Sequence, residues 1–501
     1  MSLTVSIAVI INASLLVVSC RPTGLRTIRS EPTTHHRMGF SSIPPDMDTT
    51  VDMYSGSDRK VAHAWANRWE AEMAGLINEI VAVVVLLCLL VVVIVKPRRI
   101  PEGLAGFAGA LLLIAVGSTT TNAAISKMGE LMPTALFLGA CLILAGLCER
   151  EGLFSYLGEV TVRLSHGNPS RLFLLSFLLC AMVTAALSLD TTVLLLTPVI
   201  LHMSDRARAD FRPYIYAACH LANTASLLLP VSNLTNLLAM NSSRLDFLGF
   251  ARTMFLPWCA AVAVEYIVIR VAFHSSFSHD ALLADSNYPD GDDAKSVSKD
   301  NVPMFALFVV AASLIGFMIS SSLGAPPFWV ALLACLVLFV HRVIRERAVL
   351  GEEIRRVSKN ANLSFLIFVL SLAVVVSALS DNGLGRLISP LFSGEATLMK
   401  LLVVACCSAL AANLLNNLPA AMLLIPLAAS SGSTLVMAVL IGVNIGPNLT
   451  YAGSLATILW RRIVHNHGKH ITLTRFTGIG LVSVPLCIFF ATLSLWLVTL
   501  H

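Results

Sequence analysis

One aspartate lies inside a long apolar stretch of this sequence, where a charged side chain is costly. Asp190 stands in the run A-A-L-S-L-D, followed by Thr191, Thr192 and three leucines after a valine. An ionisable side chain in a membrane helix costs about 2.5 to 3.5 kcal/mol, so its presence indicates a function. Two roles fit: a carboxyl group that binds and releases a proton, which desolvation favours, or a cap for the helix that begins near Thr192.

Neutral polar residues interrupt apolar stretches at four places, 188–192, 222–236, 413–419 and 444–457. Lipid offers these groups no hydrogen-bond partners, so they are expected to line a chamber for a small polar solute or a cation. Any one of them could instead satisfy open backbone at a helix break. The predicted substrate- and ion-binding residues are Asp190, Thr191, Thr192, Asn223, Ser232, Asn233, Asn236, Asn416, Asn417, Asn444, Asn448, Thr450, Gly453 and Ser454, with Thr457 beside them.

Cysteines are numerous but show no metal-binding pattern. The chain has 11 of them, with no CxxC pair and no Cys/His spacing suited to zinc, so we interpret them as packing residues. Binding of a metalloid by thiols would require Cys180, Cys406 and Cys407 to converge from two segments. This is the less favoured alternative. No metal site and no cofactor are predicted. Glu265 is a second buried acid, for which a helix contact and a proton relay both stay open.

The composition is that of a membrane protein. Of 501 residues, 56% are hydrophobic and only 13% charged, and the mean hydropathy is +0.80. Apolar runs near the roughly 20 residues that a bilayer requires recur throughout, which predicts an all-α polytopic protein surrounded by lipid. A β-barrel would alternate polar and apolar residues. The net charge of +5 does not indicate a nucleic-acid partner.

The hydropathy predicts where the chain crosses the membrane. Basic clusters at 96–99, 206–212, 342–347 and 461–462 fall on one side, which we assign to the cytoplasm. The acidic loop 276–302 falls on the same side. The predicted apolar segments are 75–95, 103–119, 133–148, 172–204, 213–243, 253–274, 303–321, 325–341, 362–380, 397–430, 434–460 and 475–498.

Two of these segments, 172–204 and 397–430, are too long for one crossing and too short for two. Each has a polar break near its middle, which predicts a re-entrant helical hairpin whose tip stops inside the membrane, buried in protein or facing water. With the topology above, the first hairpin enters from the cytoplasm and the second from outside.

Each hairpin is followed by a helix with a polar middle, and the two pairs align. Setting Asn223 against Asn444 also brings 232–236 onto 453–457, while Asp190 meets the asparagines of the second hairpin. Because the hairpins enter from opposite sides, the repeat is inverted. The predicted fold is therefore an inverted-repeat secondary transporter with two re-entrant helical hairpins and two discontinuous helices.

The predicted organisation has four parts. An apolar leader and a poorly ordered polar segment occupy 1–74, and the first transmembrane repeat occupies 75–275. A cytoplasmic linker at 276–302 leads to the second, inverted repeat at 303–501.

The motifs resemble a known family. T-V-L-L-L-T-P-V-I-L (192–201), the polar runs at 222–236 and 444–460, and N-N-L-P (416–419) look like the bacterial arsenite efflux permeases of the ion transporter superfamily. The resemblance implies export of arsenite and antimonite, driven by the membrane potential or the proton gradient, and a solute held without cysteine. Of these we predict exchange for protons. The resemblance also implies a soluble arsenite-stimulated ATPase as partner, and a homodimer is a further expectation. Leu189 departs from the family's pattern, which often has asparagine before the hairpin aspartate.

The alternatives to an arsenite exporter are other transporters on the same scaffold, an enzyme and an ATP-driven pump. A sodium/proton antiporter or an organic-anion carrier on the same scaffold is the alternative transporter, although an anion carrier is expected to place a cation near the site. We do not expect an enzyme, because His220 is the only histidine beside a polar break and no Ser/His/Asp set is apparent. The sequence has no phosphate-binding G-x-x-x-x-G-K-[ST] loop, which excludes an ATP-driven pump within this chain.

Overall fold

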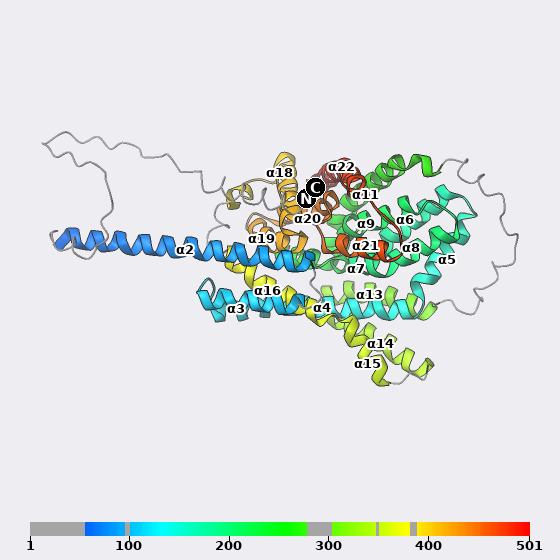
Figure 1. Ribbon diagram of the computed structural model, residues 1–501, viewed down its shortest axis with the longest axis horizontal. Helices are drawn as coiled ribbons and strands as arrows, with labels where there is room; N and C mark the ends of the chain where they lie inside the picture. The colour runs from blue at the N-terminus through cyan, green and yellow to red at the C-terminus, as the bar shows by residue number, and fades with distance from the viewer. Residues whose placement is uncertain (1–55, 96–100, 278–302, 347–349, 381–387, 501) are drawn as a thin grey trace. The chain divides into compact units, whose positions relative to one another are not determined.

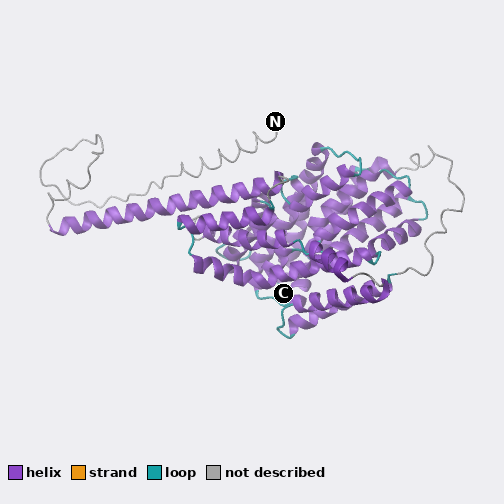
Figure 2. Cartoon of the chain, turned by 60° about the horizontal axis from the view of Figure 1, so that its bottom comes forward, coloured by secondary structure: helices purple, strands orange, loops and turns teal. Residues whose placement is uncertain are grey.

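The computed structural model describes residues 56–95, 101–277, 303–346, 350–380 and 388–500. These residues form helices and connecting loops and contain no strand (Figure 2), which confirms the predicted all-α class. Residues 1–68 and 69–501 are two separate compact units. Most of the predicted leader and of the linker at 276–302 lies outside the described residues.

The long helices alternate with short ones. Eight helices, counted over the described residues, are long and apolar enough to cross a membrane. The helices before the first hairpin and the hairpin itself are α2 Gly56–Val95, α3 Glu102–Val116, α4 Thr121–Arg150, α5 Leu153–Ser165, α6 Pro169–Ala186, α7 Leu189–Thr191, η2 Thr192–Leu196 and α8 Thr197–Arg206. Then follow α9 Phe211–Thr224, η3 Ala225–Leu227, η4 Pro230–Ser232, α10 Leu234–Ser243, α11 Phe247–Ala272 and η5 His274–Phe277.

The second half of the described chain begins at α13. Its helices are α13 Met304–Ser322, α14 Phe328–Glu346, α15 Leu350–Asn360, α16 Leu363–Leu379, η8 Ser389–Leu391, α18 Leu398–Leu415, α19 Asn417–Ala429, α20 Ser433–Ile445, η9 Gly446–Leu449, α21 Leu455–Asn466 and α22 Leu473–Thr499. Within the unit 69–501, helices α3, α4, α13, α14 and α16 pack together, and the hairpins and broken helices pack with α11 and α22 (Figure 1).

Both predicted hairpins break at their polar middles. The first turns at Leu187 and Ser188, between α6 and α7, and a hydrogen bond of 2.7 Å between the hydroxyls of Thr184 and Thr192 joins its two arms. The second turns at Asn416, where φ is 74° and ψ 156°. That conformation strains any residue except glycine and costs about 1 to 3 kcal/mol, a feature common at functional sites.

The two predicted discontinuous helices are also broken as expected. The first stops after Thr224, passes through η3 and η4, and resumes at Leu234; the second stops after Ile445 and resumes at Leu455. Pro230 and Pro447 stand in the interruptions, where their missing N–H groups cost no helical hydrogen bond. Each resuming half-helix has a polar N-cap that accepts a main-chain hydrogen bond.

Some helix boundaries correct the prediction. Helix α2 begins at Gly56, so residues 56–74 are helical rather than part of a disordered segment. They contain no proline, and their alanine, glutamate, lysine and arginine residues favour a helix. Helix α4 begins at Thr121, twelve residues before the apolar run on which the prediction rested, because Thr120 caps it and Pro133 is tolerated inside. Helices α5 and α15 are too polar for the hydropathy to have revealed them.

The charged end of α4 holds α14 and α15. Arg150 forms a bidentate ion pair with Glu353 of α15, and one of its two hydrogen bonds measures 2.7 Å. Arg342 of α14 donates to the main-chain oxygen of Arg150 at 2.9 Å and lies 3.5 Å from Glu151. Bidentate arginine pairs fix orientation as well as distance, so these contacts tie three helix ends together.

Helix ends that carry the predicted cytoplasmic charges also meet. Lys469, after α21, lies 2.8 Å from Asp205 at the end of α8, and Ser276, after α11, donates to Asp210 at 2.7 Å.

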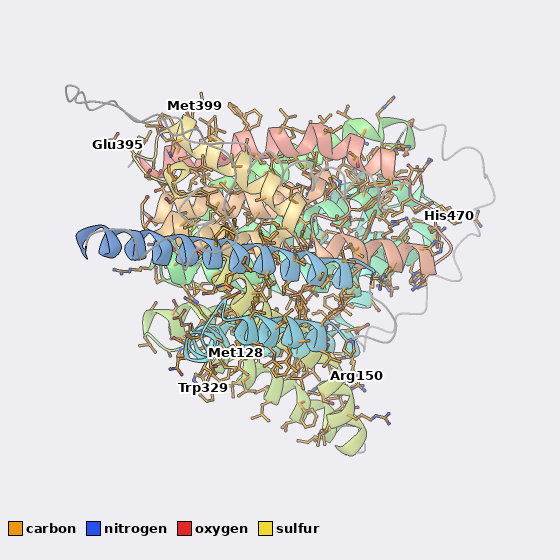
Figure 3. All side chains as sticks on the ribbon, turned by 60° about the vertical axis from the view of Figure 1, so that its left-hand side comes forward. Met128, Arg150, Trp329, Glu395, Met399 and His470 are labelled. Atoms are coloured by element: carbon orange, nitrogen blue, oxygen red, sulfur yellow. The ribbon has the colours of Figure 1, made fainter. Side chains whose placement is uncertain are left out.

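The outward faces of α14 and α18 are apolar. The side chain of Trp329 is 57% exposed and that of Met399 is 71% exposed (Figure 3). Such surfaces fit acyl chains and not water.

Glycine permits one close contact that controls the second helix break. Gly480 of α22 packs against η9, and a Cβ atom there would touch the main-chain oxygen of Asn448 and come within 3.0 Å of the Leu449 Cα. We expect Gly480→Ala to destabilise the protein by about 1 to 3 kcal/mol, because backbone cannot move aside as a flexible side chain can.

Gly478, on the same helix, is the matched control, since nothing lies within 4 Å of its added Cβ. Gly478→Ala should stay within about 0.5 kcal/mol of the unchanged protein. Thermal unfolding of the purified proteins in one detergent measures both. Equal melting temperatures for the two variants would refute the proposed contact.

Candidate functional site

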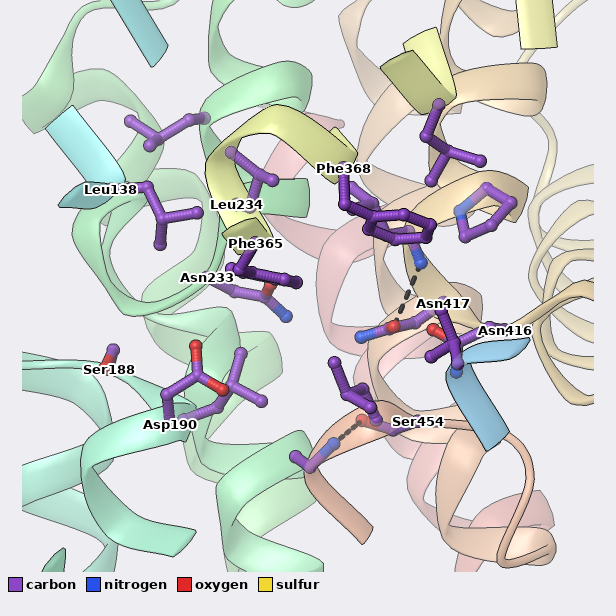
Figure 4. A pocket seen from close by; sticks show the side chains of 18 of the residues that line it. Leu138, Ser188, Asp190, Asn233, Leu234, Phe365, Phe368, Asn416, Asn417 and Ser454 are labelled. Atoms are coloured by element: carbon purple, nitrogen blue, oxygen red, sulfur yellow. Dashed lines mark hydrogen bonds between the residues drawn. The ribbon is translucent and has the colours of Figure 1, made fainter. Parts of the chain in front are cut away.

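A cavity of about 60 Å³ with a mostly apolar wall and a group of polar side chains lies where the two hairpin tips and the two broken helices meet (Figure 4). A water molecule needs about 10 to 15 Å³ of such space, so the cavity fits a few waters or one small solute. Its polar lining comes from all four interrupted segments and consists of Ser188, Asp190, Ser232, Asn233, Asn416, Asn417 and Ser454. Apolar side chains form the rest of the wall; they come from α2, α4 and α16, including Phe137, Phe365 and Phe368, and from the hairpin tips and broken helices themselves.

Asp190 supplies a carboxyl group to this cavity, opposite Asn416, Asn417 and Ser454 (Figure 4). The predicted capping role belongs to its neighbour: Ser188 accepts a hydrogen bond of 3.2 Å from the main-chain N–H of Thr191. Asp190 lies in the first turn, where the helix dipole favours a negative charge. The carboxyl group is thus positioned for the cavity rather than used as the cap.

Thr191 and Thr192 do not line the cavity, although both were predicted as site residues. Thr191 shares a hydrogen bond of 2.9 Å with the Ser188 hydroxyl, and Thr192 is bonded across the hairpin to Thr184. The segment from Thr192 to Leu196 has the wider π-helical spacing. Pro198 accounts for this, because it has no N–H to bond the carbonyl one turn earlier. These threonines hold the tip in shape.

Asn444, just before the second break, binds three residues of the first. Its side-chain oxygen accepts from the Asn233 amide at 3.2 Å and from the Thr235 hydroxyl at 2.7 Å. Its amide donates to the Asn236 oxygen at 2.8 Å. All four side chains are buried. The amide of Asn444 therefore joins the two halves of the protein through neutral hydrogen bonds.

Asn448 makes the corresponding connection from within the second break. Its oxygen accepts from the Asn223 amide at 2.8 Å, and its own amide donates to the Thr224 hydroxyl at 2.8 Å and to the main-chain oxygen of His220 at 3.0 Å. Asn223 also donates to Thr457 at 3.4 Å. Under the predicted alignment, Asn223 corresponds to Asn444, and Asn236 corresponds to Thr457. The contact between Asn223 and Thr457 is therefore equivalent to the contact between Asn444 and Asn236, as a two-fold relation between the halves requires.

The second hairpin tip is bonded to the second break. Asn413 donates to the main-chain oxygen of Gly446 at 2.8 Å and accepts from the Thr450 hydroxyl at 2.7 Å. The main-chain N–H of Asn417 donates to the Gly453 oxygen at 3.0 Å. These contacts account for Thr450 and Gly453, which shape the backbone behind the cavity and do not line it.

The structure therefore divides the predicted residues into two sets. Six of them line the cavity: Asp190, Ser232, Asn233, Asn416, Asn417 and Ser454. The others lie behind it and bind one another or the backbone. The sequence analysis did not predict Ser188, Thr224, Thr235 or Asn413 as site residues. Asn413 lies one helical turn before the Asn416–Asn417 pair, and this spacing could have identified it.

Neither thiols nor cationic side chains line the cavity among the described residues. Cys180 is buried in α6, whereas Cys406 is exposed on α18 and Cys407 is partly exposed. Over the described ranges, no group of three or more His, Cys, Asp or Glu residues could hold a metal ion. A solute here would meet one carboxyl group, carboxamides and hydroxyls.

This fold has a relative among solved structures. The YdaH transporter of Alcanivorax borkumensis matches it with a TM-score of 0.53 at 16% sequence identity, over 75% of this chain and 87% of that one. The likeness shows that the two proteins share a helical membrane fold.

The chain belongs to the citrate transporter family, whose model matches residues 81–435. Among similar curated proteins is the arsenical pump membrane protein of Escherichia coli, 27% identical over 418 residues, which cover 80% of this chain and 94% of that protein. The arsenical pump membrane protein of Yersinia enterocolitica is 28% identical over 381 residues, covering 72% and 85%. These matches confirm the resemblance found in the sequence motifs.

The Asn444 bonds give a test of the connection between the halves. We expect Asn444→Ala to destabilise the protein by about 2 to 4 kcal/mol, because it leaves buried polar groups of Asn233, Thr235 and Asn236 without this partner. Thermal unfolding measures the effect. Asn466→Ala, at an exposed position at the end of α21, is the control and should melt as the unchanged protein does. An unaltered melting temperature for Asn444→Ala would contradict the assignment.

Proposed function

We propose that this protein exports arsenite or antimonite by exchange for protons, through the cavity between the hairpin tips. The observation that carries the proposal is that the polar side chains facing this mostly apolar cavity are one carboxyl group, carboxamides and hydroxyls, with no basic side chain among the described lining residues. The names of the curated relatives add support, since several are arsenical pump membrane proteins. The proposed substrate site comprises the cavity-lining residues, and the asparagines behind them set its shape.

The chemistry of the solute suits this lining. Trivalent arsenic in water is a small, largely uncharged hydroxide, whose hydroxyl groups both donate and accept hydrogen bonds. Side chains of Asn233, Asn417 and Ser454 can exchange such bonds with water or solute at little cost. Thiolate ligation would hold arsenic more tightly and slow its release, so a cavity without cysteine among its described lining favours turnover.

Asp190 is proposed as the proton-coupling residue. It is the one carboxyl group among the residues that line the cavity. A carboxyl group that is protonated on one side of the membrane and released on the other changes the charge at the site without changing its size. The reciprocal contacts of Asn223 and Asn444 support the inverted repeat, which would let the site face either side in turn.

A second candidate is an organic-anion carrier, favoured by the description of the family model that matches 81–435. Citrate carries three carboxylates, which a binding site normally neutralises with arginine, lysine or helix N-termini. No basic side chain is among the described lining residues, and about 60 Å³ is small for such an anion. The cavity thus fits arsenite better. A soluble ATPase partner and a homodimer stay predictions.

Replacing the carboxyl group tests the coupling. In everted membrane vesicles, a proton gradient should drive uptake of radiolabelled arsenite, and Asp190→Asn should reduce this uptake about tenfold or more, equivalent to 1.4 kcal/mol or more. The asparagine amide has nearly the same size as the aspartate carboxyl group, but it cannot bind and release a proton near neutral pH. Glu149→Gln, at an exposed acid at the end of α4, is the control. Gradient-driven uptake at the unchanged rate in Asp190→Asn would refute proton coupling through this residue.

Competition distinguishes the two substrates. We expect antimonite in excess to suppress uptake of labelled arsenite in the same vesicles, and citrate in equal excess to leave it unchanged. The reason is that only antimonite matches arsenite in size and lack of charge. Suppression by citrate, or labelled citrate uptake in place of arsenite uptake, would favour the organic-anion carrier.

A further inference from the structure

A histidine and a glutamate form a buried pair away from the cavity. His220 lies one turn before the end of α9, and its Nδ1 contacts the Oε1 of Glu265, in the middle of α11. Both side chains are fully buried, with 0% exposed. Two ionisable residues inside a membrane bundle are costly and are usually retained for a function.

Glu265 also contacts a thiol. The Cys487 thiol of α22 donates to the second oxygen of Glu265 at 3.2 Å. Both oxygens of the carboxyl group therefore have a partner, His220 on one and Cys487 on the other. The other titratable side chains around the pair are Cys219 and Tyr216 on α9 itself and Tyr451, whose ring stacks on Phe476 of α22 at 4.4 Å.

The opposite edge of the imidazole makes no hydrogen bond to the described residues. His220 Nε2 is buried and has no hydrogen-bond partner among the described residues. The indole Nε1 of Trp460 is also buried and has no hydrogen-bond partner among the described residues. The imidazole of His220 and the indole of Trp460 both lie beside the ring of Phe476, at centroid distances of 5.1 and 6.0 Å. A buried nitrogen without a partner is unfavourable and is commonly found where a water, an ion or a proton binds.

The pair is connected to the network behind the cavity by a single residue. Asn448 donates from its amide to the main-chain oxygen of His220 and accepts on its oxygen from Asn223. A change in charge on the imidazole that displaces His220 therefore acts on the asparagine that joins the two broken helices.

We propose that His220 is a second proton-binding site of this transporter and that Glu265 is its positioning residue. Glu265 fixes the Nδ1–H tautomer, so the lone pair of Nε2 accepts the proton and releases it again. The pair has a net charge of −1 before this step and 0 after it. Proton binding is a property of the pair itself, whereas its part in coupling rests on the proposed function.

Protonation of His220 can be observed without any transport. In ¹⁵N-histidine-labelled protein reconstituted in lipid, one ring signal that titrates between about pH 5 and 9 should be absent from His220→Gln and displaced in Glu265→Gln. If His220→Gln does not fold, Phe476→Leu assigns the same signal through the lost ring current. A His220 signal that stays constant over this range would overturn the proposal.

Transport then tests the connection. Stimulation of arsenite uptake by a pH gradient should fall about tenfold or more in Glu265→Gln and be recovered in Glu265→Asp, which restores the carboxylate. Glu102→Gln, at a buried glutamate in the first turn of α3, is the matched control. Full stimulation in Glu265→Gln would overturn a role in coupling. Absence of arsenite uptake by the unchanged protein would refute the proposed function, while the titration would still decide the proton site.

Discussion

The structure depends on one constraint: backbone and side-chain polar groups inside a bilayer must find partners within the protein. Four helices stop in the interior of this bundle, and each interruption exposes N–H and C=O groups that a continuous helix would pair internally. Asparagines from the two halves satisfy much of this demand. Asn236 donates to the main-chain oxygens of Ser226 and Leu229, and Asn448 donates to that of His220. Without these bonds the interruptions would be costly, and with them a cavity with polar side chains can exist at the centre.

Carboxamides suit this task because one side chain both donates and accepts. They bring no net charge, so the interior avoids the desolvation penalty of ion pairs. Small residues make the approach possible: Gly446 packs directly on Ala409, and Gly480 on the backbone of η9. Close packing and neutral hydrogen bonds therefore act together at the second break. The residues that carry charge in the interior, Asp190 and the His220–Glu265 pair, are correspondingly few and individually placed.

The division between cavity lining and supporting network has a functional consequence. Groups that face the cavity, such as Asp190 and Asn417, can exchange partners with water or solute. Groups behind it, such as Asn448, are hydrogen-bonded to residues on both sides. A transporter needs both kinds of residue, because the solute must leave easily while the elements around it move in a coordinated way.

The sequence by itself determined that the chain is a helical membrane protein and where its helices break. Both follow from local chemistry: apolar runs require lipid or a protein interior, and polar residues or proline within them interrupt a helix. It could not reveal α5 or α15, whose polar faces resemble loops. It also could not tell which polar residues face the cavity. That Asn223 binds Asn448 and that His220 meets Glu265 were decided by tertiary packing alone. Each depends on how helices far apart in the chain approach and rotate against one another, and hydropathy carries no information about rotation.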